Sequence, residues 1–121
     1  MIYDDNNIFA KILRNEIPCN KIYEDDFILS FHDINPQKKI HVLVIPKGKY
    51  IDLDDFCLNA SPEEMVGLLK GINKVAELLG ISTKEGKGYR TLANISEDGG
   101  QEVPHLHFHL FGGENVGKMV Q

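Results

Sequence analysis

Residues 104–111 read Pro104-His105-Leu106-His107-Phe108-His109-Leu110-Phe111, so three histidines alternate with large apolar side chains. A chance occurrence of this spacing in a chain with five histidines among 121 residues has a probability of about 0.01. Side chains of a β-strand point alternately to the two faces of a sheet, and every second side chain lies ~6.5 Å further along. The alternation therefore predicts a strand over residues 103–111, with the imidazoles on one face and core side chains on the other.

Four further strands are expected upstream of the histidine stretch. Residues 40–45 are apolar on both faces apart from His41, and Pro46 ends the run, which is typical of a central strand with a buried histidine. The other strands are bounded by turn residues such as Asp25-Asp26. The four expected strands are Lys21 to Glu24, Phe27 to His32, Ile40 to Ile45 and Tyr89 to Asn94.

Two helices are expected from apolar residues that recur at helical spacing. One covers about residues 6 to 14, and the other covers Ser61 to Leu79. In the second helix Ser61 and Glu64 form a capping box, and Gly80 follows the end. The order of the elements predicts an α+β fold with two helices and a mainly antiparallel, five-stranded sheet.

The composition is that of one globular domain, residues 1–121, with 42% hydrophobic and 26% charged residues. The net charge of −5 and the absence of a basic run argue against binding of nucleic acid. The sequence contains neither a basic, apolar leader nor ~18 consecutive apolar residues, so we expect a cytoplasmic protein that does not bind membranes.

Three interpretations of the histidine stretch compete, and the first is a metal site. Histidines two residues apart on a strand can hold zinc. However, His105 and His109 would be separated by about 13 Å of strand, so a site would need outside ligands such as His41 or His32. No cysteine pair assists, because Cys19 and Cys57 are far apart in sequence. We therefore expect no metal and no other cofactor.

The second interpretation is nucleophilic catalysis at phosphorus. A neutral imidazole can attack a phosphoryl group while neighbouring histidines fix its tautomer and donate to the phosphate oxygens. The turn Asp98-Gly99-Gly100-Gln101 can offer backbone N–H groups to the same phosphate. The third interpretation is a set of packed or exposed histidines without a chemical role.

Residues 105–111 resemble the defining pattern of the histidine triad (HIT) superfamily, His-φ-His-φ-His-φ-φ with φ hydrophobic. The resemblance extends over nearly the whole chain and is closest to the Hint branch. It implies a HIT-like sheet extended across a homodimer, with no metal or organic cofactor. The further matching segments are Ile8-Phe9-Ala10-Lys11-Ile12, Glu16-Ile17-Pro18, Tyr23-Glu24-Asp25-Asp26, residues 31–37, residues 41–46, Gly88-Tyr89-Arg90 and Gly99-Gly100-Gln101.

The resemblance also implies an activity: binding of purine nucleoside monophosphates and hydrolysis of nucleoside 5'-phosphoramidates, in which AMP or GMP is joined to an amine. His107 would be the nucleophile that forms a nucleotidyl-histidine, and His109 would contact the phosphate. His105 and His41 would support these two rings, and Asp33 would accept both ribose hydroxyls. The implied phosphate-side residues are Asn94, Gly100, Gln101 and Glu102. The implied wall around the base consists of Ile8, Phe9, Ile12, Ile17, Phe31, His32 and Ile34.

Three positions depart from common forms of the family. Some members hold a structural zinc through a cysteine pair near the first helix, but Asn7 and Ala10 stand there in this chain, so we expect that site to be absent. Glu102 stands where animal members often carry a hydroxyl. An ionised Glu102 would repel a phosphate, whereas a protonated one could donate to a leaving amine.

Two other functions remain open from the sequence. The first is hydrolysis of dinucleoside polyphosphates, and the second is a nucleotide-binding regulatory or scaffold role with vestigial activity. Each proposed site residue also has a purely structural interpretation. The apolar residues of the base wall would then belong to the core, and Asp33 would only cap the turn at Asn35-Pro36.

Overall fold

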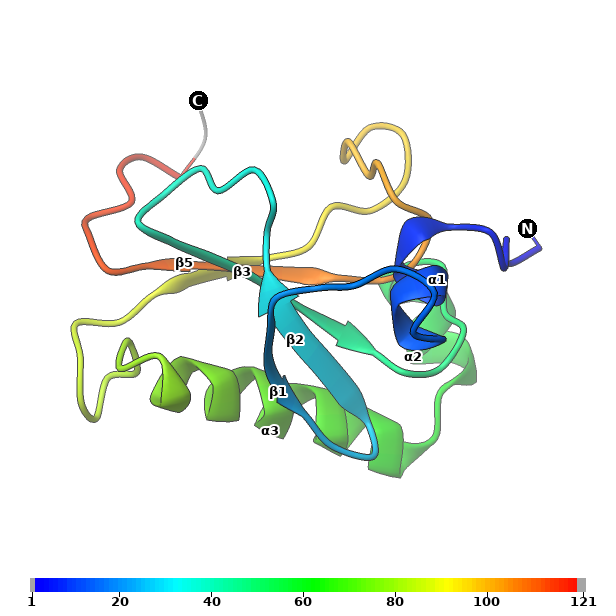
Figure 1. The fold of residues 1–121 in the computed structure, drawn as a ribbon, viewed down its shortest axis with the longest axis horizontal. Coiled ribbons are helices and arrows are strands. Elements are labelled where there is room, and N and C mark those ends of the chain that lie inside the picture. The colour runs from blue at the N-terminus through cyan, green and yellow to red at the C-terminus, as the bar shows by residue number, and fades with distance from the viewer. Residues whose placement is uncertain (1, 120–121) are drawn as a thin grey trace.

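The computed structural model describes residues 2–119, whose five strands form one antiparallel sheet in the order β1-β2-β3-β5-β4 (Figure 1). The predicted five-stranded sheet is confirmed, and β3 lies at its centre. The strand expected before Pro46 includes that proline, and the strand expected at residues 89–94 is shorter. The strands are β1 (Lys21–Glu24), β2 (Ile28–His32), β3 (Ile40–Pro46), β4 (Arg90–Leu92) and β5 (Phe108–Gly112).

Residues 2–119 contain three helices, so the expectation of two was wrong. These are α1 (Ile8–Leu13), α2 (Leu53–Asn59) and α3 (Pro62–Leu78). The unexpected α2 has only seven residues, too few for a helical period to stand out, and the Asp52 side chain caps it by accepting from Asp55 N at 2.8 Å. Its buried anchor is Phe56. None of these helices is long and apolar enough to cross a bilayer.

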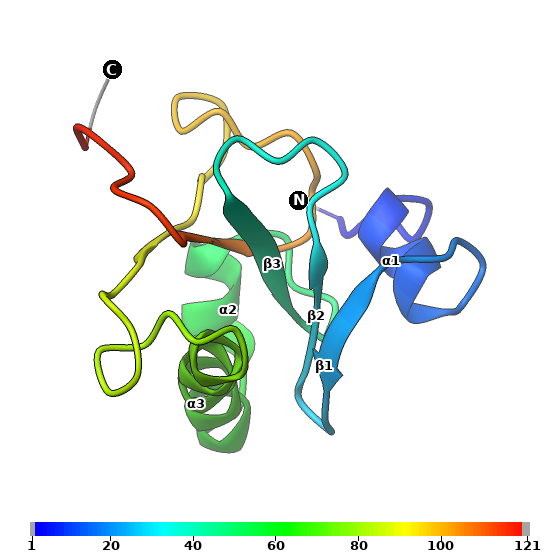
Figure 2. The ribbon, with the colours of Figure 1, turned by 60° about the vertical axis from the view of Figure 1, so that its left-hand side comes forward.

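Helices cover both faces of the sheet, with α2 and α3 on one side and α1 on the other (Figure 2). Alternate side chains of β3 explain the apolar run on both faces. Val42 and Val44 pack in the core under α3, whereas Leu43 and Ile45 pack in a second core under α1. The odd-numbered side chains of β3, which include the buried His41, therefore face the side of α1.

The capping box of α3 is confirmed. Ser61 Oγ accepts from Glu64 N at 3.1 Å, and the Glu64 carboxylate accepts from Ser61 N at 3.0 Å. The helix lies close to β2 because Gly71 faces it: a Cβ atom there would stand 2.6 Å from Ile28 Cδ1. After the helix, Gly80 adopts a left-handed φ of 71°, which favours glycine.

The expected strand over residues 103–111 is wrong in its first half. β5 begins at Phe108, and residues 103–107 follow an irregular path. Pro104 has no N–H group to donate to a neighbouring strand, and Leu106 N donates to Tyr50 O at 2.8 Å. The three histidines therefore do not share one face of a strand.

Candidate active site

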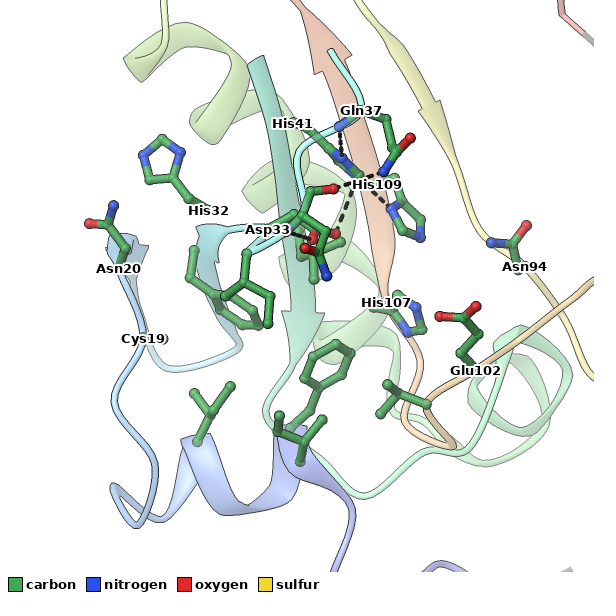
Figure 3. Close-up of a pocket in the computed structure, with 18 of the residues that line it drawn as sticks. Cys19, Asn20, His32, Asp33, Gln37, His41, Asn94, Glu102, His107 and His109 are labelled. Carbon is green, nitrogen blue, oxygen red and sulfur yellow. Dashed lines mark hydrogen bonds and ion pairs between the residues drawn. The ribbon is translucent and has the colours of Figure 1, made fainter. Parts of the chain in front are cut away.

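A cleft of about 680 Å³ opens beside β3 and β5, between α1 and the loops of residues 33–37 and 94–103 (Figure 3). Most of the expected site residues line it, including His107, His109, His41, Asp33 and Glu102. Figure 3 shows Glu102 and Asn94 near His107, while His32 and Asn20 lie at the opposite end. The other expected residues that line the cleft are Ile8, Phe9, Ile12, Phe31, Ile34 and Gly100.

His107 is held in a single neutral tautomer. Its side chain is 6% exposed, and Nδ1 lies 2.7 Å from the backbone oxygen of His105. Because a carbonyl only accepts, Nδ1–H must donate, and the lone pair is left on Nε2. Burial lowers the pKa of His107, against the smaller opposing effect of Asp33 and Glu102. The ring is thus an oriented, uncharged imidazole at neutral pH, the state in which Nε2 can act as a nucleophile.

A hydrogen-bonded relay orients His109. The backbone N–H of Gln37 donates to His41 Nδ1 at 3.0 Å, so neutral His41 carries its proton on Nε2. That Nε2–H donates to His109 Nδ1 at 2.9 Å, so the proton of His109 sits on its own Nε2. Burial lowers the pKa of His109 to about 4 and also lowers that of His41, which keeps both rings neutral.

His109 Nε2 is a buried donor without a partner among residues 2–119. A buried N–H group that makes no hydrogen bond costs free energy, so it is a strong position for a ligand oxygen. His109 and His107 lie next to one another, with ring centroids 5.2 Å apart. One ring offers a lone pair and the other a proton, which suits attack on a phosphoryl group and stabilisation of its oxygens.

The carboxylate of Asp33 lines the cleft and lies beside His41, the first ring of the His41–His109 pair. Oδ1 accepts from Asn35 N at 2.8 Å, and Oδ2 lies 3.4 Å from His41 Nε2. Asp33 and Glu102 are the carboxylates of the cleft, and none of the described residues that line it is a lysine or an arginine. Hydrogen-bond donors rather than fixed positive charges must therefore hold an anionic group there.

A divalent metal does not fit this arrangement. Ligand atoms of Asp33, His41 and His109 all lie within 4.8 Å of one another. However, a metal on His41 Nε2 would require the proton on Nδ1, where it would oppose the N–H of Gln37. The tautomer that the surrounding backbone selects is the one that donates from Nε2, which is the wrong one for a ligand.

Three expected site residues lie outside the cleft. His105 is fully buried, and its Nε2–H donates to Pro46 O at 2.8 Å. Ile17 packs against the core under α1. The Gln101 side chain does not reach the cleft. Its amide donates to Ile51 O at 2.6 Å and accepts from Ser96 N at 2.9 Å, and so links residue 51 to the loop of residues 94–103. Gln101 thus holds the turn that carries Gly100.

Six lining residues were not expected from the sequence. Leu43 could have been found, because it lies two residues after His41 on the same face of β3. The others come from loops whose positions depend on the packed structure. The six residues are Cys19, Asn20, Asn35, Gln37, Leu43 and Val103.

Comparisons with known proteins identify the family of this chain. The family model of the HIT domain matches residues 14–116. The chain belongs to the HIT family. A purine nucleoside phosphoramidase of Escherichia coli K12 is 39% identical to this HIT protein over 117 residues, which cover 96% of this chain and 94% of that one. A HIT-like protein of Azospirillum brasilense is 52% identical over 98% of this chain and 94% of its own length.

Solved structures show the same fold. A HIT family hydrolase from Clostridium thermocellum superposes with a TM-score of 0.85 at 39% identity, covering 98% of this chain and 99% of that one. A histidine triad nucleotide-binding protein from Candida albicans gives a TM-score of 0.74 at 36% identity, covering 87% and 73%. The HIT-like architecture is thereby established for this chain.

Proposed function

We propose that this HIT protein hydrolyses purine nucleoside 5'-phosphoramidates through a nucleotidyl-histidine intermediate. The observation that carries the proposal is the pairing of His107, whose Nε2 keeps a lone pair, with His109, whose buried Nε2–H has no partner within residues 2–119. The similarity to an Escherichia coli purine nucleoside phosphoramidase supports the choice of substrate class.

The reaction proceeds in two displacements at phosphorus. In the first, His107 Nε2 forms a bond to phosphorus while the bond from phosphorus to the amine breaks, and the amine departs with a proton from Glu102 or water. In the second, water attacks phosphorus and returns a proton to Glu102 or to solvent, the bond to His107 breaks, and the nucleoside monophosphate is released. His109 donates to a non-bridging phosphate oxygen in both steps.

The remainder of the cleft suits a purine nucleoside. Asp33 accepts hydrogen bonds from the two vicinal ribose hydroxyls, for which a carboxylate with two oxygens is well suited. The apolar side chains of Ile8, Ile12 and Phe31 offer flat contact for the base. In this proposal the base lies toward α1 and the phosphate toward β5.

The absence of lysine and arginine among the described lining residues favours this substrate over a dinucleoside polyphosphate. A polyphosphate leaving group carries several negative charges, and no lysine or arginine among the described lining residues would offset them. A phosphoramidate releases an amine, which brings no such charge. A binding-only role would leave the poised tautomers of His107 and His109 without a use.

The proposal includes a homodimer in which the sheet continues from one copy to the next. Within residues 2–119, β4 pairs only with β5, so its other edge offers free backbone donors and acceptors. A second copy of the chain can pair with that edge antiparallel to itself. Thr91→Pro should then shift the protein from dimer to monomer in sedimentation velocity, and a monomeric wild-type protein would contradict this part.

The decisive experiment measures hydrolysis of an AMP-tryptamine phosphoramidate by the wild-type protein and His107→Ala, with a metal chelator present. We expect turnover that resists the chelator and is lost in His107→Ala, while AMP still binds. Faster cleavage of diadenosine tetraphosphate would favour the polyphosphate function. Tight AMP binding without any turnover would favour the binding-only role, and inhibition by the chelator would restore the metal interpretation.

A further inference from the structure

The side chain of Tyr3 reaches the buried end of the histidine stretch. Its hydroxyl lies 2.6 Å from His105 Nδ1, and the two rings meet edge to face with centroids 5.6 Å apart. Tyr3 precedes residues 14–116, the part of the chain that the HIT domain model matches. The contact joins the N-terminal segment to the histidine stretch across 102 positions of sequence.

The polarity of the contact follows from the other nitrogen of the same ring. His105 Nε2 lies 2.8 Å from the backbone oxygen of Pro46, so Nε2–H donates and Nδ1 keeps the lone pair. The hydroxyl of Tyr3 must therefore be the donor to Nδ1. With both bonds made, a ring that is 0% exposed has no unpaired polar atom.

The same residue, His105, holds the nucleophile through its main chain. Its carbonyl oxygen accepts the Nδ1–H of His107 at 2.7 Å, and this bond leaves the lone pair on His107 Nε2. The ring of Phe9 contacts both imidazoles, with centroids 6.3 Å from His105 and 5.0 Å from His107. A displaced His105 ring would press on Phe9, and Phe9 also packs against His107.

We infer that Tyr3 is a positioning residue for His107: its hydroxyl locks the His105 ring, and the locked His105 carbonyl fixes the tautomer of the nucleophile. Without the hydroxyl, His105 Nδ1 becomes a buried acceptor without a partner, and the ring gains by moving toward another donor. The carbonyl then holds His107 less firmly. This inference rests on the proposed role of His107 as the nucleophile.

The N-terminal segment is tied down independently of the Tyr3 hydroxyl. Arg14 Nη1 donates to Asp5 O at 2.8 Å, and Lys49 pairs with the Asp5 carboxylate at 2.8 Å. Asn7 Nδ2 donates to Asp4 O at 2.7 Å. Tyr3→Phe removes the contacts of the hydroxyl with His105 and with the Asn7 side chain, while these other bonds should keep the segment docked.

The test compares Tyr3→Phe with Tyr23→Phe, a matched control that removes a hydroxyl bonded to Asp25 at 3.0 Å in the β1–β2 hairpin. Steady-state kinetics on the AMP-tryptamine phosphoramidate give kcat and KM. For Tyr3→Phe we expect kcat to fall about tenfold with KM within about twofold of wild type, since the substrate contacts are intact. Tyr23→Phe should match wild type in both constants.

Nitrogen-15 NMR of histidine-labelled protein supplies the second readout. In Tyr3→Phe the His107 ring signals should move from those of a single tautomer toward an average of two, while in Tyr23→Phe they should not. An unchanged kcat, an equal loss in both variants, or a lower kcat with unmoved His107 signals would overturn the inference. If the wild-type protein hydrolyses no phosphoramidate, the proposed function fails, and the NMR comparison by itself still decides the role of Tyr3.

A measurement on the wild-type protein covers the case in which Tyr3→Phe does not fold. The phenolic proton of Tyr3, held in the hydrogen bond to His105, should exchange slowly and show a nuclear Overhauser effect to the His105 ring. Observation of that proton supports the donor role, and its absence at low temperature overturns it.

Discussion

His41 Nε2 lies 2.9 Å from His109 Nδ1, although 68 positions separate the two residues in the chain. The bond joins β3 to β5. Because Gln37 N–H fixes the tautomer of His41, it also fixes, through this bond, the tautomer of His109, the ring proposed to contact the phosphate. Because Asp33 Oδ2 stands 3.4 Å from the same His41 nitrogen, the loop that would bind the ribose contacts the group that would orient the phosphate donor. Under the proposed function, sugar recognition and chemistry would share this one hydrogen-bonded network.

Removing the donor of this relay should impair chemistry more than binding. In His41→Phe, His109 Nδ1 loses its partner, so the His109 proton is free to sit on either nitrogen and the donor to phosphate is lost part of the time. We expect kcat for the phosphoramidate to fall about 10- to 100-fold and the Kd for AMP to change less than about threefold. Equal losses in kcat and AMP affinity would contradict a role in orientation.

Asp33→Asn should remove discrimination at the sugar. The wild-type protein should prefer a ribonucleoside phosphoramidate over its 2',3'-dideoxy analogue by about 10- to 100-fold in kcat/KM, because the analogue leaves the carboxylate unpaired. In the variant the two substrates should differ by less than about threefold. The kcat/KM values of the two proteins on the two substrates measure the coupling between Asp33 and the ribose hydroxyls. An unchanged preference in Asp33→Asn would show that the ribose binds elsewhere.

Glu102→Gln should alter the pH dependence of turnover more than it alters the affinity for AMP. The substitution keeps the shape of the side chain but removes an acid–base group from the phosphate end of the cleft. We expect one limb of the profile of kcat against pH to move or disappear, with AMP affinity close to wild type. Equal affinity together with an unchanged profile would exclude Glu102 from proton transfer.

Stability should fall on mild acidification. Burial lowers the pKa of His105 to about 4 from its ordinary value of 6.5, so between pH 6.5 and 4 the unfolded chain binds the proton that the folded protein excludes. The contribution of His105 to the free energy of unfolding therefore has its full value above about pH 6.5 and decreases as the pH falls from 6.5 to about 4. His105 alone should account for about 2 kcal/mol between pH 7 and 5. Urea denaturation at the two pH values measures the combined loss from the buried histidines, of which His105 is one, and equal values would contradict neutral buried rings in the folded protein.

The sequence predicted the central parts of the fold better than the irregular ones. The capping box at Ser61 and the apolar run at residues 40–45 depend on local spacing, and the structure confirms both. The helix at Leu53–Asn59 was missed because one buried phenylalanine gives no period. The strand expected from Val103 failed because Pro104 and the bond from Leu106 N to Tyr50 O redirect the chain.

The site residues were also predicted only in part from the sequence. Sequence spacing singled out His107 and His109, and the structure brings both to the cleft, but the same spacing placed His105 beside them. The buried position of His105 depends on Pro46 and Tyr3, residues 59 and 102 positions away. A pattern of alternate residues carries no information about such distant partners.

The order of the amino acids specifies which chemical groups this protein possesses: a triplet of imidazoles, two carboxylates suited to the cleft, and the strands and helices that follow from local side-chain periodicity. The protonation state and orientation of those groups depend on the packed fold. A neutral imidazole has two tautomers of similar energy in water, and the nitrogen that keeps the proton is chosen by the partners that packing supplies. Here Gln37 N–H, the His105 carbonyl and the Pro46 carbonyl make that choice for His41, His107 and His105.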